Sequence, residues 1–395
     1  MSHKRKQELD SSAAAPSRRH AMITQRDIAE RCGIHQTTVS LALRRDPRIS
    51  PETTDEILAV AAEMGYDPSV HTPARRLAMH RHGQAVLNHV IAVSMDPTYL
   101  HMHYYAAIFQ SVVEVLMTKG YAVVLSHLPK TAATPAEVAL PTIFHRGDVD
   151  GLLYTIDENR FRPVYAHLRE TPGFGQRPMI SLMWPSDLNS SVMADDRQGA
   201  YQAAKHLLDL GHRHLLQFTL RQVKQDQRIQ QWRWDGIRQA LREARLDPEA
   251  HLHFFDVAQE WLDPLWNPLG TPPVAPHPPR EAANHPLMRF LRAHPEITAI
   301  LALNDSSAIQ AWYLLNLAGL RVPDDYSIVG FDDVDPMFDD YGHNQLTSVH
   351  LPLMRIGRKA AALIIEQVSG GAAERVQLCL PTELIPRAST GPARA

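Results

Sequence analysis

A short polar segment near residue 36 carries side chains that can hydrogen bond to nucleic acid. Gln36 offers a donor together with an acceptor, which the edge of an adenine requires, and Thr37 offers a hydroxyl and a methyl group. Arg44 and Arg45 follow with two guanidinium groups that can contact phosphates, although a solvated helix end explains this pair equally well. These groups could serve a nucleic-acid interface only if the surrounding elements hold them on one accessible surface.

Three short helices are expected to position this segment. Thr24 and Asp27 have the spacing of a capping box, and Gly33 ends that helix because glycine adopts positive φ at little cost. A second helix is expected over about 35–44, and Ser50-Pro51-Glu52 supplies the cap, first-turn proline and early acid of a third. A helix, a tight glycine turn and a second helix form a helix-turn-helix, whose second helix enters the major groove. Some other small all-α domain is the alternative interpretation.

The order of these features resembles the DNA-binding head of the lactose-repressor (LacI) family of bacterial transcription regulators. The helix caps, the turn glycines and the small residues of the second helix all match the family pattern. The matching residues are Thr24, Asp27-Ile28-Ala29, Gly33, Thr38-Val39-Ser40, Leu43, Ile49-Ser50-Pro51-Glu52-Thr53 and Gly65-Tyr66 followed by Pro68. The resemblance identifies 21–67 as the head, and the Ser-, Ala- and charge-rich residues 1–20 are expected to be a disordered tail.

The resemblance also implies which residues of the head contact DNA. It places Gln36, Thr37 and Leu41 at base-reading positions, where Leu41 replaces a longer polar residue of many relatives and favours a thymine methyl. His35 replaces the family's usual serine at the helix start, where it is a poorer cap and can instead reach a phosphate. The implied set is Thr24, His35, Gln36, Thr37, Thr38, Ser40, Leu41, Arg44, Arg45 and Leu77, with Thr38, Ser40, Arg44 and Arg45 assigned to phosphates.

Residues 68–88 are expected to form a hinge that follows the head. In relatives a short helix here orders on DNA, and a leucine from each subunit enters the minor groove and kinks the duplex. Ala74, Arg75 and Leu77 resemble the hinge residues, slightly later in the sequence than usual, so Leu77 is the implied wedge. A linker leucine that packs on the body is an equally good interpretation.

Beyond the hinge, apolar runs alternate with helical periods. Such alternation predicts parallel sheets with helices on both faces, and the number of strands predicts two doubly wound lobes. Ligands of such sheets gather at the carboxyl ends of the strands. Strands are expected at 90–94, 122–126, 150–156, 178–182, 214–218, 299–303 and 327–331, with helices at about 198–210 and 228–245.

The same resemblance covers this body and implies an effector-binding core similar to periplasmic sugar-binding proteins. Its landmarks include Asp150-Gly151, Gly211-His212, Asn304-Asp305 and Val329-Gly330-Phe331-Asp332-Asp333. The expected fold class is therefore α+β and multidomain, with a small all-α head and a doubly wound, two-lobed α/β core over 89–390. Lobe one is placed at about 89–218 and 332–380, and lobe two at about 219–331 and 381–390.

The resemblance places Arg233 and Asp305 where relatives hydrogen bond their ligand. An arginine and a carboxylate in one cleft suit a polyhydroxylated ligand, because one donates and the other accepts. Structural ion pairing is the alternative for both. Further candidates for the wall of the site follow the first expected strand or could stack on a sugar ring, although core packing explains each aromatic equally well. They are Tyr99, His101, Tyr104 and Tyr105 after the strand, and Trp184, Trp232 and Trp234 as stacking surfaces.

One segment departs from the family pattern. Residues 261–286 are rich in proline and read as an insertion that cannot form a regular helix or strand. A surface loop without a role is the first interpretation, and a lid over the cleft is the second.

Charge and composition limit the other functions. Residues 1–81 hold 13 Lys and Arg against 10 Asp and Glu, and the rest holds 27 against 33, so a mildly basic head joins an acidic body. Cys32 and Cys379 form no disulfide framework, which suits a reducing compartment. With no apolar run long enough for a membrane and no secretory signal, the chain is expected in the bacterial cytoplasm, associated with the nucleoid.

Histidine pairs are the sequence's one hint of metal chemistry. The pairs 101/103, 212/214 and 251/253 lack an HExxH pattern and nearby cysteines, so no metal, no cofactor and no enzymatic activity are expected.

The expected function is a sequence-specific DNA-binding transcriptional regulator, in most of the family a repressor. It is expected to bind a pseudopalindromic double-stranded operator as a homodimer, under allosteric control by a small carbohydrate. The rival interpretation is a soluble sugar-binding or sugar-processing protein with a vestigial head.

Overall fold

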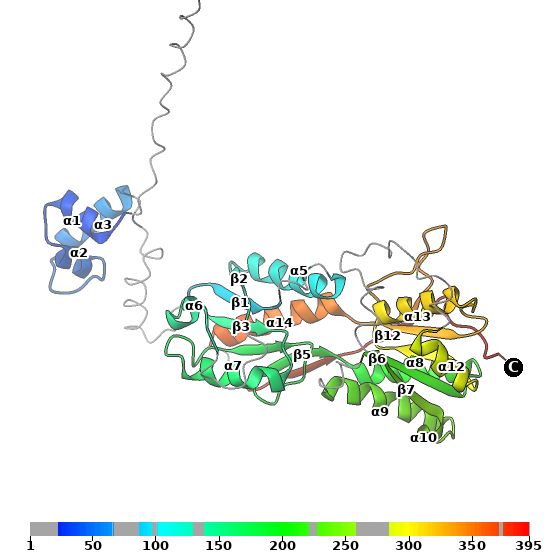
Figure 1. Ribbon diagram of the computed structural model, residues 1–395. Helices are drawn as coiled ribbons and strands as arrows, with labels where there is room; N and C mark the ends of the chain where they lie inside the picture. The colour runs from blue at the N-terminus through cyan, green and yellow to red at the C-terminus, as the bar shows by residue number, and fades with distance from the viewer. Residues whose placement is uncertain are drawn as a thin grey trace, which may run out of the picture. The chain divides into compact units, whose positions relative to one another are not determined.

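The computed structural model describes residues 23–64, 66, 87–96, 100, 102–128, 138–220, 227–257, 284–370 and 374–394. The chain divides into two compact units, Met1–Val86 and Leu87–Ala395. Figure 1 shows the helices and strands of both units. The expected tail at 1–20, the hinge over 68–86 and most of the proline-rich insertion lie outside the described residues.

The first unit contains three helices whose starts follow local chemistry. Thr24 and Asp27 form the expected capping box, and the Ser50 side chain accepts from the Thr53 amide at the start of the third helix. Gly33 adopts a φ of 66° and closes the first helix. The helices are α1 (Gln25–Cys32), α2 (Gln36–Ala42) and α3 (Pro51–Glu63).

Residues from all three helices form the hydrophobic core of this unit. Ile28 of α1, Val39 and Ala42 of α2 and Ile57 of α3 expose 2% of their surface or less. Because α2 turns Val39 and Ala42 inward, its other side chains are exposed or half-buried. The core therefore fixes which side of α2 a partner can reach.

The second unit contains two six-stranded sheets. The first sheet has the strand order β11-β5-β4-β3-β1-β2. All of its neighbouring strands are parallel. Its strands are β1 (Val90–Ser94), β2 (Ala122–Ser126), β3 (Gly151–Tyr154), β4 (Met179–Leu182), β5 (Ser190–Ala194) and β11 (Gln377–Leu380).

The second sheet has the order β12-β10-β9-β8-β6-β7. Its neighbours are parallel except for the antiparallel pair of β10 and β12 at one edge. Its strands are β6 (His214–Leu220), β7 (Leu252–Val257), β8 (Ile297–Ala302), β9 (Ser327–Asp332), β10 (Thr347–His350) and β12 (Glu383–Ile385). We call each sheet with its helices a lobe.

Helices cover both faces of each sheet, as the sequence predicts. Ile91 and Val93 of β1 belong to the cluster that includes α5 and α14, whereas Ala92 packs with α6 and α7. In the second sheet, Leu215 packs with α8 and α9, and Leu216 packs with α12 and α13. The helices are α5 (His103–Thr118), α6 (Thr142–His145), α7 (Glu158–Glu170), α8 (Asp196–Asp209), α9 (Gln227–Glu243), α10 (Pro248–His251), α12 (Pro286–Ala293), α13 (Asp305–Leu317) and α14 (Leu353–Val368).

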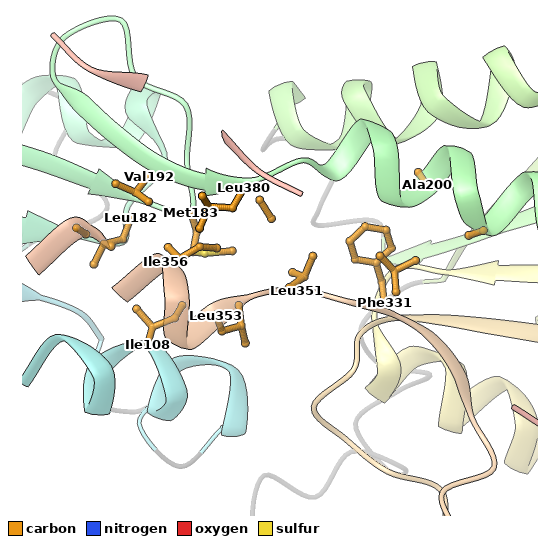
Figure 2. Close-up of a cluster of buried hydrophobic side chains, with 14 of the residues drawn as sticks. Ile108, Leu182, Met183, Val192, Ala200, Phe331, Leu351, Leu353, Ile356 and Leu380 are labelled. Carbon is orange, nitrogen blue, oxygen red and sulfur yellow. The ribbon is translucent and has the colours of Figure 1, made fainter. Parts of the chain in front are cut away.

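One hydrophobic cluster runs from one lobe into the other. Ile108 and Ile356 lie in the first lobe, Phe331 lies at the end of β9, and Leu351 lies between them (Figure 2). All four are buried. Apolar burial therefore holds the two lobes of this unit together.

The expected lobe boundaries need correction. Residues 214–218 and 347–350 were expected in the first lobe, but they form β6 and β10 of the second sheet. The reason is that α8 begins directly after β5 and packs on α9, so the chain changes lobe near residue 195. The chain crosses back to the first lobe near residue 351, after β10 has paired with β9 in the second sheet.

Two smaller differences concern segment ends. The Asn88 amide donates to Asp150 at 2.8 Å, so the second unit begins slightly before the expected residue 89. Pro286, the last residue of the expected insertion, is the first residue of α12, where proline is well tolerated. Among the described residues, no helix is both long and apolar enough to cross a membrane.

Candidate functional site

The polar side of α2 is open to solvent. Gln36 and Thr37 are exposed, whereas Val39 holds the opposite side in the core. His35 is the N-cap residue: its Nδ1 accepts from the Thr37 amide at 3.4 Å and lies 2.8 Å from the Thr37 hydroxyl. His35 thus caps the helix, where the sequence suggested that it caps poorly. The two residues assigned to bases remain accessible.

The end of α2 holds the residues assigned to phosphates. The Arg44 guanidinium donates to both the carbonyl and the hydroxyl oxygen of Ser40, so these two side chains form one bonded group. Arg45 is exposed and has a φ of 51°. Thr38 and Leu41 are half-buried. The assignment of these residues to DNA stays a prediction.

Thr24 and Leu77 complete the predicted DNA-binding set. The Thr24 hydroxyl donates to Asp27 Oδ2 at 2.7 Å within the capping box of α1. Leu77 lies outside the described residues. The structure therefore brings His35 to Arg45 together, whereas Thr24 belongs to the cap of α1.

A charged cluster lies in the second unit, where α9 meets the strands of the second sheet. Arg233 Nε donates to Asp196 Oδ1 at 2.7 Å, and Nη1 donates to the Leu303 carbonyl at 2.6 Å. The guanidinium carbon lies 3.6 Å from the ring centroid of Phe331. Only 12% of the Arg233 side chain and 2% of the Asp196 side chain are exposed. Protein groups therefore neutralise this charge in place of water.

Asp332 is a carboxylate of this cluster that the sequence analysis did not assign. It ends β9 and has a φ of 101°, in the left-handed region. Burial raises its pKa well above the usual range; Arg233 opposes the rise, and Asp305 and Asp196 add to it, so all three groups lie near. Its carboxylate makes no hydrogen bond or ion pair with another residue of the described ranges. Its position directly after a buried strand was the available signal.

Tyr104 brings the first lobe to this cluster. It lies in the first turn of α5 and packs against the cluster that joins the lobes. Burial raises the pKa of its hydroxyl well above the ordinary value, and the nearby Asp332 charge adds to the rise. An aromatic ring of one lobe thus neighbours a carboxylate of the other.

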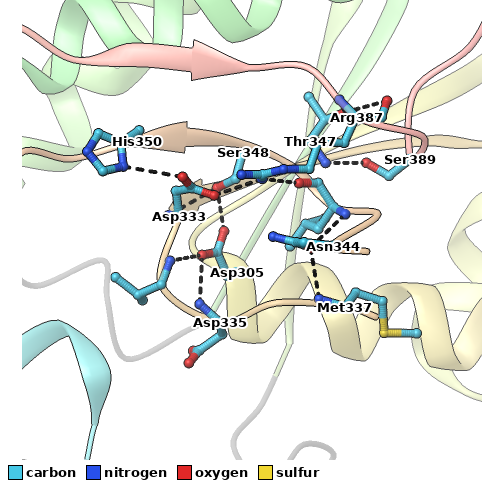
Figure 3. Close-up of polar contacts among 12 residues, drawn as sticks. Asp305, Asp333, Asp335, Met337, Asn344, Thr347, Ser348, His350, Arg387 and Ser389 are labelled. Atoms are coloured by element: carbon cyan, nitrogen blue, oxygen red, sulfur yellow. Dashed lines mark hydrogen bonds and ion pairs between the residues drawn. The ribbon is translucent and has the colours of Figure 1, made fainter. Parts of the chain in front are cut away.

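Asp305 is bonded within the protein. Its Oδ2 accepts from the backbone amides of Val334 at 2.7 Å and Asp335 at 3.2 Å, and its Oδ1 accepts from the Ser348 hydroxyl (Figure 3). Burial raises its pKa to about 7, and these three hydrogen bonds oppose the rise. The carboxylate therefore fastens the turn after β9 to the first turn of α13.

The two residues assigned to a ligand, Arg233 and Asp305, thus contact different groups. Both lie near Asp332, which makes Asp332 the link between them. Trp184 is partly buried and packs against the cluster that joins the lobes, and Tyr99 lies outside the described residues. The roles of all four in binding stay predictions.

Two protein-family models match this sequence, one in each unit. Residues 24–69 match the model described as bacterial regulatory proteins, lacI family. Residues 204–390 match the model of a periplasmic binding protein-like domain.

Relatives and solved structures span most of the chain. A transcriptional repressor named PurR from Haemophilus influenzae (strain PittEE) is 27% identical, over 93% of this chain and 98% of its own. A complex of the regulator CelR with cellobiose is 22% identical, with a TM-score of 0.58 over 93% of this chain and 99% of its own. The lac repressor dimer bound to operator and an anti-inducer is 21% identical, with a TM-score of 0.58 over 94% of this chain and 100% of its own. The two structural likenesses show the fold.

Removal of the Arg233 side-chain charge should destabilise the second unit strongly. Arg233→Met leaves the buried Asp196 carboxylate without its partner, which should lower the free energy of unfolding by about 3–5 kcal/mol. Arg321→Met is the matched control, because Arg321 pairs with Asp324 at 3.0 Å with both side chains more than half exposed. Arg321→Met should lower the free energy of unfolding by only about 0–1 kcal/mol. Equal losses in urea unfolding of the two variants would contradict the importance of the buried pair.

The stability of the second unit should depend on the protonation of Asp305. Because its pKa is about 7 in the fold against an ordinary 3.8, the folded chain binds more protons between these values than the unfolded chain. The free energy of unfolding should therefore fall as the pH rises from about 4 to 7, then level off. Asp305→Asn stays neutral at every pH, so its free energy of unfolding should lack this fall between about pH 4 and 7. The test is urea unfolding of both proteins across this pH range; parallel curves would show that Asp305 does not titrate there.

Proposed function

The chain belongs to the LacI family of bacterial regulatory proteins, and we propose that it is a DNA-binding transcriptional repressor controlled by a small carbohydrate. The observation that carries the proposal is α2. Its core side is anchored by Val39 and Ala42, and its opposite side presents Gln36 and Thr37 to solvent. A helix held in this way can enter the major groove with its hydrogen-bonding groups free.

Two heads of a homodimer would read the two halves of a pseudopalindromic operator. Their half-sites would lie about 34–36 Å apart, or a multiple of this, because the same face of the duplex recurs with that period. Gln36, Thr37 and Leu41 would contact base edges, and Arg44 and Arg45 would contact phosphates. Residues 21–67 then act as the head and 68–88 as a hinge, with Leu77 as its minor-groove wedge.

The charged cluster suits a polyhydroxylated effector. Asp332 can accept hydrogen bonds from ligand hydroxyls, since the described residues leave its carboxylate unbonded. Arg233 presents guanidinium donors beside it, and Tyr104 adds an aromatic surface from the other lobe. The residues lie at the carboxyl end of β9, where ligands of parallel sheets bind. Solved relatives of this fold contain ribose and cellobiose, which supports the carbohydrate class.

The effector would control DNA binding through a shift in the arrangement of the lobes. An effector that binds one arrangement more tightly raises the population of that arrangement. The effector then changes the affinity for DNA by the same factor by which DNA changes the affinity for the effector. As a regulator of transcription, the chain would act in the cytoplasm at the nucleoid.

Two variants of α2 should separate base reading from phosphate contact. Thr37→Ala should relax the preference at one operator position by about 1–3 kcal/mol, because a base-edge contact is lost. Arg44→Ala should weaken binding to every sequence and flatten its salt dependence. The measurement is a selection of bound DNA from random duplexes, followed by binding titrations at several salt concentrations. If wild-type chain prefers no duplex over competitor DNA, the proposed function is wrong.

Asp332→Asn should uncouple DNA binding from the effector. The probe is the sugar that most raises the melting temperature of the wild-type chain, from a panel that includes ribose and cellobiose. Loss of a charged acceptor should weaken its binding about 10-fold or more. Operator binding without sugar should persist, because the head is intact, but the response of operator affinity to the sugar should be lost.

The control is Asp340→Asn, an exposed acid on the loop that follows β9. It should bind the sugar as the wild type does. Equal sugar affinity in both variants would remove Asp332 from the effector site. If no sugar changes operator affinity in gel-shift titrations, the allosteric part of the proposal is wrong.

A further inference from the structure

Histidines gather at the amino-terminal edge of the second sheet. His214 is the first residue of β6, His253 lies at the start of β7, and Glu296 directly precedes β8. These three strands are neighbours and parallel, so their amino-terminal ends meet at one edge. His251 and His294 flank the same edge, at the ends of α10 and α12. Four imidazoles and one carboxylate thus lie together.

Three of these side chains have the separations that a metal ion requires. One ligand atom from each of His214, His253 and Glu296 lies within 4.8 Å of the other two. His214 Nδ1 and His253 Nε2 are 3.1 Å apart. Nitrogen ligands of tetrahedral Zn²⁺ lie about 2.0–2.1 Å from the ion, which sets their mutual separation at about 3.3 Å. The observed spacing is close to that value.

A neighbouring histidine orients one of these ligands: His294 Nδ1 lies 3.1 Å from Glu296 Oε1. His251, which packs beside another ligand, is itself held with its Nδ1 3.0 Å from the Arg213 carbonyl oxygen. The His251 ring is 4.5 Å from the His214 ring, centroid to centroid. Partners of this kind fix the orientation of metal ligands in protein sites.

The ladder between β6 and β8 is irregular at this point. His214 pairs with Ile297, but Leu215 pairs with Ala299, so Thr298 is an extra residue. Irregularities of this kind redirect side chains and occur often beside functional sites. This one lies two residues from Glu296 and directly at His214.

From this geometry we propose that His214, His253 and Glu296 bind a Zn²⁺ ion, with water in the fourth position. Two imidazoles and a carboxylate are ligands that suit this ion. In the bound form each imidazole carries its proton on the nitrogen that faces away from the metal. The two facing nitrogens then both offer lone pairs, and no net proton is released.

The position of the site suggests what the ion does. It joins the starts of β6 and β7 and the segment before β8, so it would stabilise the second lobe. Strands of six or seven residues separate it from Asp332 at the carboxyl edge, which is about 20–23 Å at about 3.3 Å per residue. The zinc site is therefore distinct from the proposed effector site and does not depend on the proposed function.

No metal was expected from the sequence, because the His-x-His pairs lack an HExxH pattern and nearby cysteines. The structure takes one histidine from the pair at 212/214 and one from the pair at 251/253. His212 itself is used elsewhere: its ring nitrogens contact the hydroxyls of Thr298 and Ser327. Only the pairing of β6 with β7 brings the two ligands together.

The test uses the full chain without a histidine tag, stripped of metal with a chelator. Titration calorimetry with Zn²⁺ should show one tight site per chain, and Zn²⁺ should raise the melting temperature. Co²⁺ should give the visible absorption of a tetrahedral site. His214→Gln and His253→Gln should each weaken Zn²⁺ binding more than 10-fold and abolish the Co²⁺ spectrum. His294→Ala should weaken binding about 10-fold, because it removes the group that orients Glu296.

The matched control is His343→Gln, an exposed histidine 76% accessible at its side chain, which should bind as the wild type does. Circular dichroism of the metal-free variants should match the wild type, so that lost binding is not lost folding. If His214→Gln or His253→Gln misfolds, Glu296→Gln serves in its place and should also lose the Co²⁺ spectrum. Unchanged Zn²⁺ affinity in these variants, or no tight site in the wild type, would overturn the proposal.

Discussion

The buried contact between Arg233 and Asp196 is the interaction on which the charged cluster depends. Arg233 comes from α9, and its partners are the first turn of α8, the carbonyl that follows β8 and the Phe331 ring of β9. A buried ion pair gains little net stability, because desolvation offsets the attraction. The ion pair instead fixes the positions of its neighbours, because four elements of the second lobe meet at the Arg233 guanidinium. Phe331 belongs to the hydrophobic cluster that joins the lobes, so the cation is tied to that contact as well.

The adjacent carboxylates Asp332 and Asp333 have separate roles. Asp333 pairs with Arg387 at 2.7 Å and lies 3.2 Å from His350 Nδ1, so it belongs to the scaffold (Figure 3). Asp332 faces Arg233 and Tyr104 instead. Both have left-handed φ values, 101° and 55°, which cost free energy in residues other than glycine. Strain of this kind persists where surrounding contacts fix the backbone, and here the two adjacent carboxylates reach different partners.

The parts that sequence could predict are those fixed by local chemistry. Caps at Thr24 and Ser50 and the turn at Gly33 set the head, and the continuous apolar runs of β1 and β2 were found at their true ends. The predicted lobe boundaries were wrong because they depend on which strands are neighbours in a sheet. Neighbouring strands come from distant parts of the sequence, so local patterns do not reveal their pairing. The same holds for the sites. Arg233 was identified from resemblance, whereas its neighbour Asp332 and the approach of His214 to His253 arise only when distant segments pack.

The charge balance of the cluster indicates which state an effector would favour. Burial disfavours the charged form of three carboxylates here, those of Asp196, Asp305 and Asp332. The Arg233 guanidinium lowers the pKa of Asp196 and of Asp332. Asp196 and Asp305 have partners, so the uncompensated cost falls on Asp332. Separation of the lobes would let more water reach this half-buried carboxylate, whereas a ligand hydroxyl that donates to it would remove the cost with the lobes together. Such a ligand therefore binds the closed arrangement more tightly than an open one, and differential affinity of this kind is what any allosteric shift requires.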